Sequence, residues 1–350
     1  MKRALVSILS ICLIFSLVSC GKKDKTDTQN SKKYPDFKVA LAIDEGGVED
    51  DSFNQSAWEA AKDFSQSTGA SVMYQEADGE KYYYKNFEIL AQGGYDIIWC
   101  IGFNMQEQMK EAAKKFPDQL FAIVDADLGE DIPKNIISIS FSAQQSAFLS
   151  GYIASRTTKT NNLGFVKGSE SVHINAFENG FKAGVAYGAK ELGKEINVFI
   201  ESRNTYDDAS IAQEAANKLI NKNCDIIHQC AGAAGLGVIN VCKNNGIYAI
   251  GVDKDQNYVA PKTVLTSSMK QVGSAIYTIC LKVAEGENLG GTNQILGIES
   301  GCTGVCPSSD KTVPKEIMDK VYVLAEKIKT KEIIQPKNEN EYNEFIKTLK

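Results

Sequence analysis

Acidic, amide and aromatic side chains crowd into one turn near the start of the folded part of the chain. The apolar run Val39 to Ile43 predicts a strand, and the residues that follow it, Asp44 to Asn54, combine several carboxylates with an amide and the ring of Phe53. In an open parallel sheet, ligands bind in the crevice outside the carboxyl ends of the strands, and this turn would lie there. We therefore expect the turn to line a ligand pocket.

The same turn should also begin a helix. Ser52 and Gln55 are spaced as in a capping box, which predicts a helix from Phe53 to Phe64. The acids from Glu49 to Asp51 would then lie at the positive end of the helix dipole, and complementing that dipole is their more ordinary role.

The first twenty residues are typical of a bacterial export signal. Basic residues precede an apolar run from Ala4 to Val18, which is too short to span a bilayer comfortably. The run ends in small residues directly before Cys20 and so resembles a lipobox. We expect residues 1–19 to be a lipoprotein signal peptide, Cys20 to carry the acyl anchor on the outer side of a membrane, and residues 20–36 to be a disordered tether. The alternative is an ordinary cleaved signal in which Cys20 is incidental.

The length and the charge of the chain limit its domain organisation and its partners. About 314 of the 350 residues follow the tether, which is more than one hydrophobic core usually serves, so two lobes are expected. The net charge of -6, with acids and bases interspersed, argues against a nucleic-acid partner. We expect a monomer.

The cysteines do not show the pattern of a disulfide framework. Of nine, Cys12 lies in the signal and Cys20 is the proposed anchor, which leaves an odd number. Most of the others lie in apolar strands or on helices and are expected to be buried. Cys302 and Cys306 lie in a Gly-rich loop and could pair, a possibility the sequence leaves open. With two histidines and no zinc spacing, we expect neither a metal nor a cofactor.

Strand and helix patterns alternate almost without exception, which predicts an α/β protein with right-handed crossovers. Most strand candidates are short apolar runs, as in parallel sheets buried on both faces. The chain runs through the βα scheme twice, so we expect two Rossmann-like lobes with parallel sheets and three hinge crossings near 142, 268 and 300. The predicted lobes are 37–142 plus 268–300 and 143–267 plus 301–350.

Several longer motifs resemble those of the basic membrane protein family, bacterial substrate-binding lipoproteins whose characterised branch is the purine nucleoside receptor type serving ABC transporters. The resemblance covers essentially the whole mature domain. The motifs are Asp51-Ser-Phe-Asn-Gln-Ser-Ala-Trp58, Phe121-Ala-Ile-Val-Asp125, Phe177-x-x-Gly180-Phe-x-x-Gly184, Ala231-Gly-Ala-Ala-Gly-Leu-Gly237, Ala249-Ile-Gly-Val-Asp253 and Thr266-Ser-Ser-Met-Lys270. The family has a type I periplasmic binding protein fold with a three-crossing hinge.

The resemblance implies a set of ligand-binding residues. Phe53 and Phe177 match the two family phenylalanines between which a purine stacks, and Asp44 matches the carboxylate that accepts hydrogen bonds from the purine edge. Read alone, Phe177 could be an ordinary core aromatic and Phe53 part of a helix start.

Five further positions match family residues at or around the ribose. Carboxylate, amide and ammonium groups suit ribose hydroxyls, which both donate and accept. Turn-forming or capping roles are the alternatives for the two strand-ending aspartates, and a solvated helix position is the alternative for the lysine. The five are Asn54, Asp125, Gly232 through its backbone, Asp253 and Lys270.

The resemblance thus implies a substrate-binding lipoprotein that captures purine nucleosides of the adenosine, guanosine and inosine class for a membrane permease. No nucleophile with a matching base, no Walker motif and no kinase signature is present, so we do not expect an enzyme, although a nucleoside hydrolase built on aspartates is conceivable. Two alternatives remain: a surface adhesin that binds host matrix, and a sugar-binding protein of the same fold.

Overall fold

The computed structural model describes residues 33–349 of the chain. The predicted signal peptide, the proposed lipidation site at Cys20 and most of the predicted tether lie outside the described residues. The described part begins against the first lobe, where the backbone N–H of Tyr34 donates to the carbonyl of Thr68 (2.9 Å) and Lys33 pairs with Glu285 (3.0 Å).

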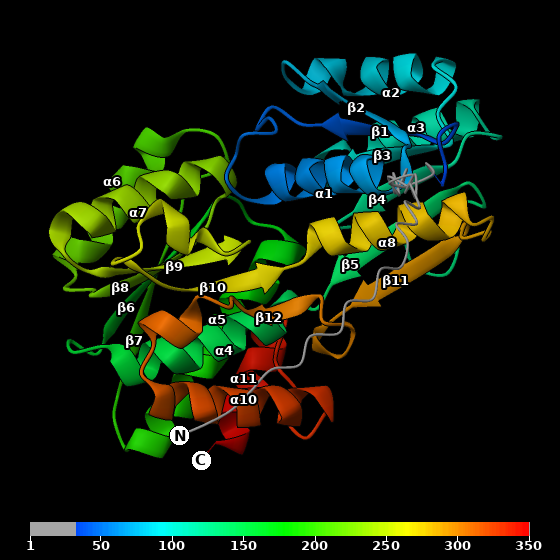
Figure 1. The fold of residues 1–350 in the computed structure, drawn as a ribbon. Helices are drawn as coiled ribbons and strands as arrows, with labels where there is room; N and C mark the ends of the chain where they lie inside the picture. The colour runs from blue at the N-terminus through cyan, green and yellow to red at the C-terminus, as the bar shows by residue number, and fades with distance from the viewer. Residues whose placement is uncertain (1–32, 350) are drawn as a thin grey trace, which may run out of the picture. The chain divides into compact units, whose positions relative to one another are not determined.

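Two six-stranded sheets organise the described residues, and we call the part built on each sheet a lobe (Figure 1). In the first lobe all strands are parallel, in the order β11-β5-β4-β3-β1-β2. The strands are β1 (Lys38–Ile43), β2 (Ser71–Glu76), β3 (Ile97–Ile101), β4 (Phe121–Val124), β5 (Ile136–Phe141) and β11 (Thr292–Leu296). The helices of this lobe are α1 (Phe53–Thr68), α2 (Tyr83–Gln92), α3 (Gln106–Lys115) and α8 (Val272–Ala284).

The second lobe repeats the scheme in the order β12-β10-β9-β8-β6-β7, and only β12 is antiparallel. Its strands are β6 (Asn162–Lys167), β7 (Asn197–Ser202), β8 (Ile226–Cys230), β9 (Tyr248–Asp253), β10 (Val264–Lys270) and β12 (Thr303–Val305). Its helices are α4 (Ala143–Thr157), α5 (Val172–Leu192), α6 (Ala209–Asn221), α7 (Gly235–Asn245), α9 (Ser309–Thr312), α10 (Lys315–Lys329) and α11 (Glu339–Thr348).

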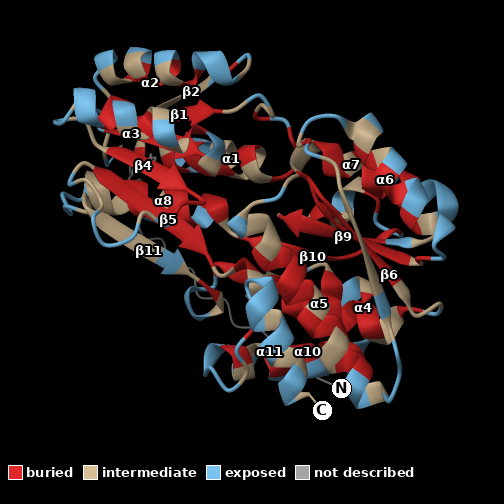
Figure 2. Ribbon diagram, turned by 180° about the vertical axis from the view of Figure 1, so that it is seen from behind, coloured by how far each residue is buried: buried red, intermediate tan, exposed pale blue. Residues whose placement is uncertain are grey.

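The central strands of each sheet are buried on both faces, as Figure 2 shows, whereas the edge strands β2, β7 and β11 are partly exposed. Alternate residues of a strand point to opposite faces. In β1, Val39, Leu41 and Ile43 enter the core beneath α1 and α8, whereas Ala40 and Ala42 enter the core beneath α2 and α3. The predicted α/β class with parallel sheets is therefore confirmed.

The chain passes between the sheets three times. After β5 it enters α4 of the second lobe, after β10 it returns to α8, which packs on α1, and after β11 it goes back to β12. The carboxyl ends of the strands in both lobes are consequently brought to a shared cleft, where a ligand site is expected.

The predicted capping box at the start of α1 is wrong. The Ser52 side chain does not cap the helix, but donates instead to Asp253 in the other lobe (2.6 Å). The buried carboxylate of Asp50 accepts the backbone N–H groups of Ser52 (2.9 Å), Asn54 (2.8 Å) and Gln55 (2.9 Å). An acid three residues before the first helical amide can reach these donors, so Asp50 has the ordinary dipole-complementing role that the sequence suggested.

Candidate ligand-binding site

One cavity lies between the two lobes and is lined by residues of both. The first lobe contributes the turns that follow β1, β3 and β4, and the second contributes the start of α5 and the ends of β8, β9 and β10. All eight residues predicted from the sequence line this cavity: Asp44, Phe53, Asn54, Asp125, Phe177, Gly232, Asp253 and Lys270.

Asp44 and Asn54 form one polar wall of the cavity. The amide of Asn54 donates to the Asp44 carboxylate (2.8 Å), and the backbone N–H of Gly46 donates to the same oxygen (3.1 Å). The Asn54 Oδ1 atom is buried and has no hydrogen-bond partner among residues 33–349. This wall is therefore rich in acceptors, which suits a ligand edge that carries N–H or O–H donors.

Two phenylalanine rings approach the same ammonium group from opposite lobes. The Nζ atom of Lys270 lies 4.4 Å from the ring centroid of Phe53, on α1, and 5.7 Å from that of Phe177, on α5. Both distances are within cation–π range. The two predicted aromatic residues thus share one small region of the cavity.

Close helix packing determines where Phe177 lies. A Cβ atom at Gly184 would stand 1.9 Å from the carbonyl oxygen of Phe148, and one at Gly180 would stand 2.4 Å from that of Gln144. Only glycine at these positions allows α5 to approach α4 so closely. Phe177, Gly180 and Gly184 lie on the same helix, so the close packing of α5 on α4 fixes the position of the Phe177 ring in the cavity.

A buried lysine joins two aspartates that come from different lobes. Lys270, at the end of β10, lies 2.5 Å from the carboxylate of Asp125, which follows β4, and 3.5 Å from that of Asp253, which ends β9. Both aspartates have left-handed backbone, with φ of 61° and 64°, a conformation that Asp tolerates better than most residues. The charge cluster thus forms where strand ends from the two sheets meet.

Burial and charge shift the titration of these groups in definite directions. Burial raises the pKa of Asp44 and of Asp253 above the usual carboxyl range, in spite of the hydrogen bonds that each accepts. Burial alone would lower the pKa of Lys270, but the charges of Asp125 and Asp253 outweigh it and raise that pKa. The lysine is therefore a permanent cation at neutral pH.

Several residues that line the cavity were not predicted. Phe103 and Asn104 follow β3 just as Asp44 follows β1, so their position at a strand end was a usable signal. Tyr206 lies in the loop after β7, and no pattern in the sequence singled it out. Phe103 also contacts His173 of the second lobe, with ring centroids 5.3 Å apart.

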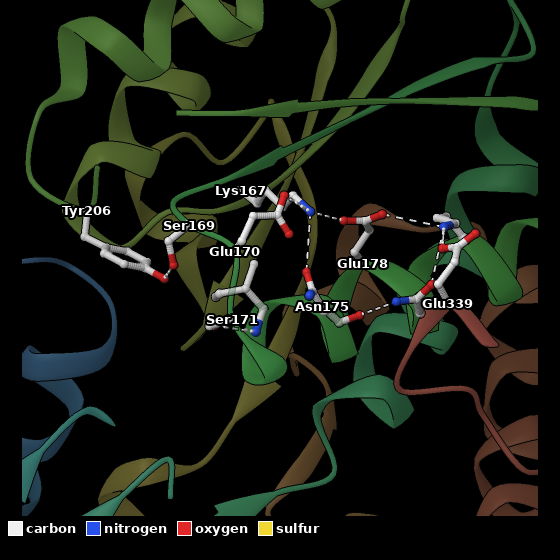
Figure 3. Close-up of polar contacts among 11 residues, drawn as sticks. Lys167, Ser169, Glu170, Ser171, Asn175, Glu178, Tyr206 and Glu339 are labelled. Carbon is white, nitrogen blue, oxygen red and sulfur yellow. Dashed lines mark hydrogen bonds and ion pairs between the residues drawn. The ribbon is translucent and has the colours of Figure 1, made fainter. Parts of the chain in front are cut away.

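A polar network supports the second-lobe wall (Figure 3). The hydroxyl of Tyr206 lies 2.6 Å from that of Ser169, in the loop between β6 and α5. The ammonium of Lys167, at the end of β6, pairs with Glu178 (2.6 Å) and Glu170 (2.8 Å). These contacts connect the loop to the start of α5, which carries Phe177.

Neither the cysteines nor the acids form a metal site in the described residues. The seven cysteines between Cys100 and Cys306 are buried free thiols. Cys302 and Cys306 flank the extended strand β12, and four residues of strand span about 13 Å, beyond the reach of a disulfide. The pairing that the sequence left open is therefore not formed.

A Cys–His contact beside the cavity does not have the properties of a nucleophilic pair. The thiol of Cys230 lies 3.6 Å from Nδ1 of His228, which is stacked between Phe165 and Phe181. Burial lowers the pKa of His228 to about 3 and raises that of Cys230 well above its ordinary value. The proton therefore stays on the sulfur, whereas a nucleophile would need the thiolate.

No helix in the described part of the chain combines the length and the apolar character that a bilayer crossing requires.

Comparison with known proteins agrees with the fold. Residues 37–339 match the family described as ABC transporter substrate-binding protein PnrA-like. Basic membrane protein B of Borreliella burgdorferi is 33% identical over 343 residues, which cover 95% of this chain and 96% of that protein. The ABC transporter nucleoside-binding protein BmpA of Lactococcus lactis is 32% identical over 324 residues, which cover 86% of this chain and 90% of that protein.

A solved structure is similar over nearly the same extent. A solute-binding protein of an ABC transporter system from Aeropyrum pernix superimposes with a TM-score of 0.80 at 24% identity, covering 89% of this chain and 97% of that one. At this identity the likeness supports the fold alone. The family match and the relatives confirm the resemblance, and a protein of this kind binds its solute outside the cytoplasm for a membrane permease. The chain belongs to the basic membrane protein family of PnrA-like ABC transporter substrate-binding proteins.

Proposed function

We propose that this protein captures purine nucleosides between its lobes and passes them to its permease. The observation that carries the proposal is the composition of one cavity, in which Phe53 and Phe177 from opposite lobes lie beside the charge cluster of Lys270. Aromatic faces stack on a flat heterocycle. Carboxylates and an ammonium group pair with the hydroxyls of a pentose.

The charges of the cavity favour a neutral ligand. Four aspartates, Asp44, Asp50, Asp125 and Asp253, line it together with one lysine. Both carboxylates nearest Lys270 already share its charge. A ligand with hydroxyl and N–H donors suits this surface, whereas a phosphate group would be repelled by the excess of acids.

The name of one relative supports the same ligand class, because the Lactococcus lactis protein is called nucleoside-binding. We also propose that acyl chains on Cys20 hold the domain at the membrane surface. Metabolic labelling with radioactive palmitate tests this anchor: a Cys20→Ala variant should carry no label, and equal labelling of the variant would contradict it.

Titration calorimetry on the full-length chain tests the proposed ligand. We expect guanosine, adenosine and inosine to bind, and AMP to bind at least about tenfold more weakly than adenosine because its phosphate meets unpaired acids. Glucose and ribose serve as the sugar controls. Native mass spectrometry of the protein as purified adds an independent observation, since a retained ligand identifies itself by mass.

Two outcomes would overturn the proposal. Binding of a sugar with no binding of any purine nucleoside would assign the cavity to sugar transport. Steady release of hypoxanthine from inosine would assign the aspartates to hydrolysis.

A further inference from the structure

A second set of polar contacts joins the lobes outside the cavity. The side-chain amide of Gln256 donates to the backbone carbonyl of Asp51 (2.9 Å), the hydroxyl of Tyr258 donates to the Asp51 carboxylate, and Lys254 pairs with Glu59 (3.2 Å). We call these five residues the latch. Asp51 lies in the turn before α1 and Glu59 lies within α1, both in the first lobe, and the other three residues follow β9 in the second lobe. None of the five lines the cavity.

The second-lobe side of the latch is anchored firmly. Gln256 is fully buried, and its side-chain oxygen accepts from the backbone N–H of Val252 (3.0 Å) and from Gln229 (2.8 Å). Its own backbone N–H donates to the hydroxyl of Ser267 (3.2 Å). Its amide donor is thus held in place toward the first lobe.

The first-lobe side is a turn in an uncommon conformation. Asp51 has a φ of 50°, in the left-handed region. Such a conformation persists where surrounding contacts favour it, and here Gln256 and Tyr258 contact Asp51 from the other lobe. The next residues in the chain are Ser52, which contacts Asp253, and Phe53, which lines the cavity.

The two segments of the latch are therefore continuous with the two walls of the cavity. Asp51 directly follows Asp50 and stands two residues before Phe53, both of which line the cavity, and Lys254 directly follows Asp253. Parting of the lobes breaks the latch and opens the cavity in the same motion.

We propose that the latch residues determine ligand affinity without touching the ligand, because they stabilise the closed arrangement of the lobes. When only a fraction of the molecules is closed, the apparent dissociation constant rises in inverse proportion to that fraction. Loss of the latch should therefore weaken every ligand by the same factor, mainly through faster dissociation. This inference holds whichever solute the cavity binds.

The test is the double variant Tyr258→Phe/Lys254→Met in the full-length chain, with Tyr322→Phe as its matched control. Tyr322 is also about half exposed and donates to a carboxylate, that of Asp310, but both residues lie in the second lobe. We expect the double variant to bind guanosine, adenosine and inosine about five- to tenfold more weakly, by one common factor. The control should bind as the natural protein does.

Two results would overturn the inference: unchanged affinity in the double variant, or losses that differ several-fold between nucleosides, which would indicate direct contact with the ligand. The thermal unfolding of the ligand-free double variant should match that of the control, which separates latch loss from misfolding. If no nucleoside binds, the proposed ligand is wrong, and small-angle scattering of the ligand-free proteins then decides the latch. A larger radius of gyration in the double variant supports it, and identical profiles refute it.

Discussion

Two buried lysines with similar surroundings serve different regions of this molecule. Lys270 and Lys167 are 5% and 6% exposed, each ends a strand of the second sheet, and each lies between two carboxylates. The partners of Lys270 come from both lobes, and its ammonium faces aromatic rings in the cavity. The partners of Lys167, by contrast, both belong to the second lobe (Figure 3).

The difference shows that burial and ion pairing alone do not mark a binding site. The network of Lys167 continues inside its lobe, because Glu178 also contacts Lys182 (3.5 Å), which pairs with Glu339 of α11 (2.7 Å). It thereby ties α5 to the C-terminal helix. The cluster of Lys270 extends across the cleft instead. The origin of the partners, and not their number, separates the structural lysine Lys167 from the lysine of the proposed ligand site.

The largest effect is expected from Lys167→Met. Removing Lys167 leaves the buried carboxylate of Glu178 with only the more distant ammonium of Lys182 (3.5 Å), so the free energy of unfolding should fall by about 3 kcal/mol. Urea denaturation measures this change. The double variant Lys167→Met/Glu178→Leu should recover most of the loss, because the carboxylate then left without a partner, Glu170, is exposed to water, and Lys182 keeps its pair with Glu339. Lys315→Met, in an exposed pair with Asp319 (2.6 Å), is the control and should change stability by less than about 0.5 kcal/mol. An equal loss in both single variants would contradict the contrast.

For Lys270→Met the loss should appear in binding instead. A hydrogen bond to a charged group contributes about 1.5 to 3 kcal/mol, so nucleoside affinity measured by calorimetry should weaken by that amount. The free energy of unfolding should fall less than in Lys167→Met, because water reaches the cleft cluster when the lobes part. Unchanged affinity would remove Lys270 from the site, and a stability loss as large as that of Lys167→Met would erase the distinction between the two lysines.

Much of this organisation could be predicted from the sequence because its causes are local. Apolar runs that end in Asp125 and Asp253 place carboxylates at strand ends, where parallel sheets gather their ligands. Gly180 and Gly184 lie four residues apart and so fall on one face of α5, the face that packs closely on α4. The alternation of strands and helices predicts both sheets.

Other features depend on contacts that no local pattern carries. Ser52 looked like a helix cap, but its hydroxyl donates to Asp253, 201 residues away, and this competing partner decides its role. The short strand β12 pairs antiparallel with β10 only because the chain crosses back after β11. Nothing in the sequence distinguished Lys167 from a surface lysine, since its burial results from the packing of α5 and the loop before it.

A smaller effect should come from Asp50, a cleft carboxylate with which no lysine among residues 33–349 forms an ion pair. Burial raises its pKa to about 6, although three backbone N–H groups donate to it. The folded state then holds a proton that the unfolded state releases near pH 4, so the contribution of Asp50 to stability is greatest at low pH and is lost as pH rises through about 6. Between about pH 5 and pH 7 this group should lower the free energy of unfolding by about 1 kcal/mol.

Urea denaturation of the natural protein and of Asp50→Asn at both pH values isolates the effect, because groups common to both proteins cancel in the difference. Between these pH values the free energy of unfolding of Asp50→Asn should fall by about 1 kcal/mol less than that of the natural protein. An identical decline would mean that the backbone donors keep the carboxylate ionised.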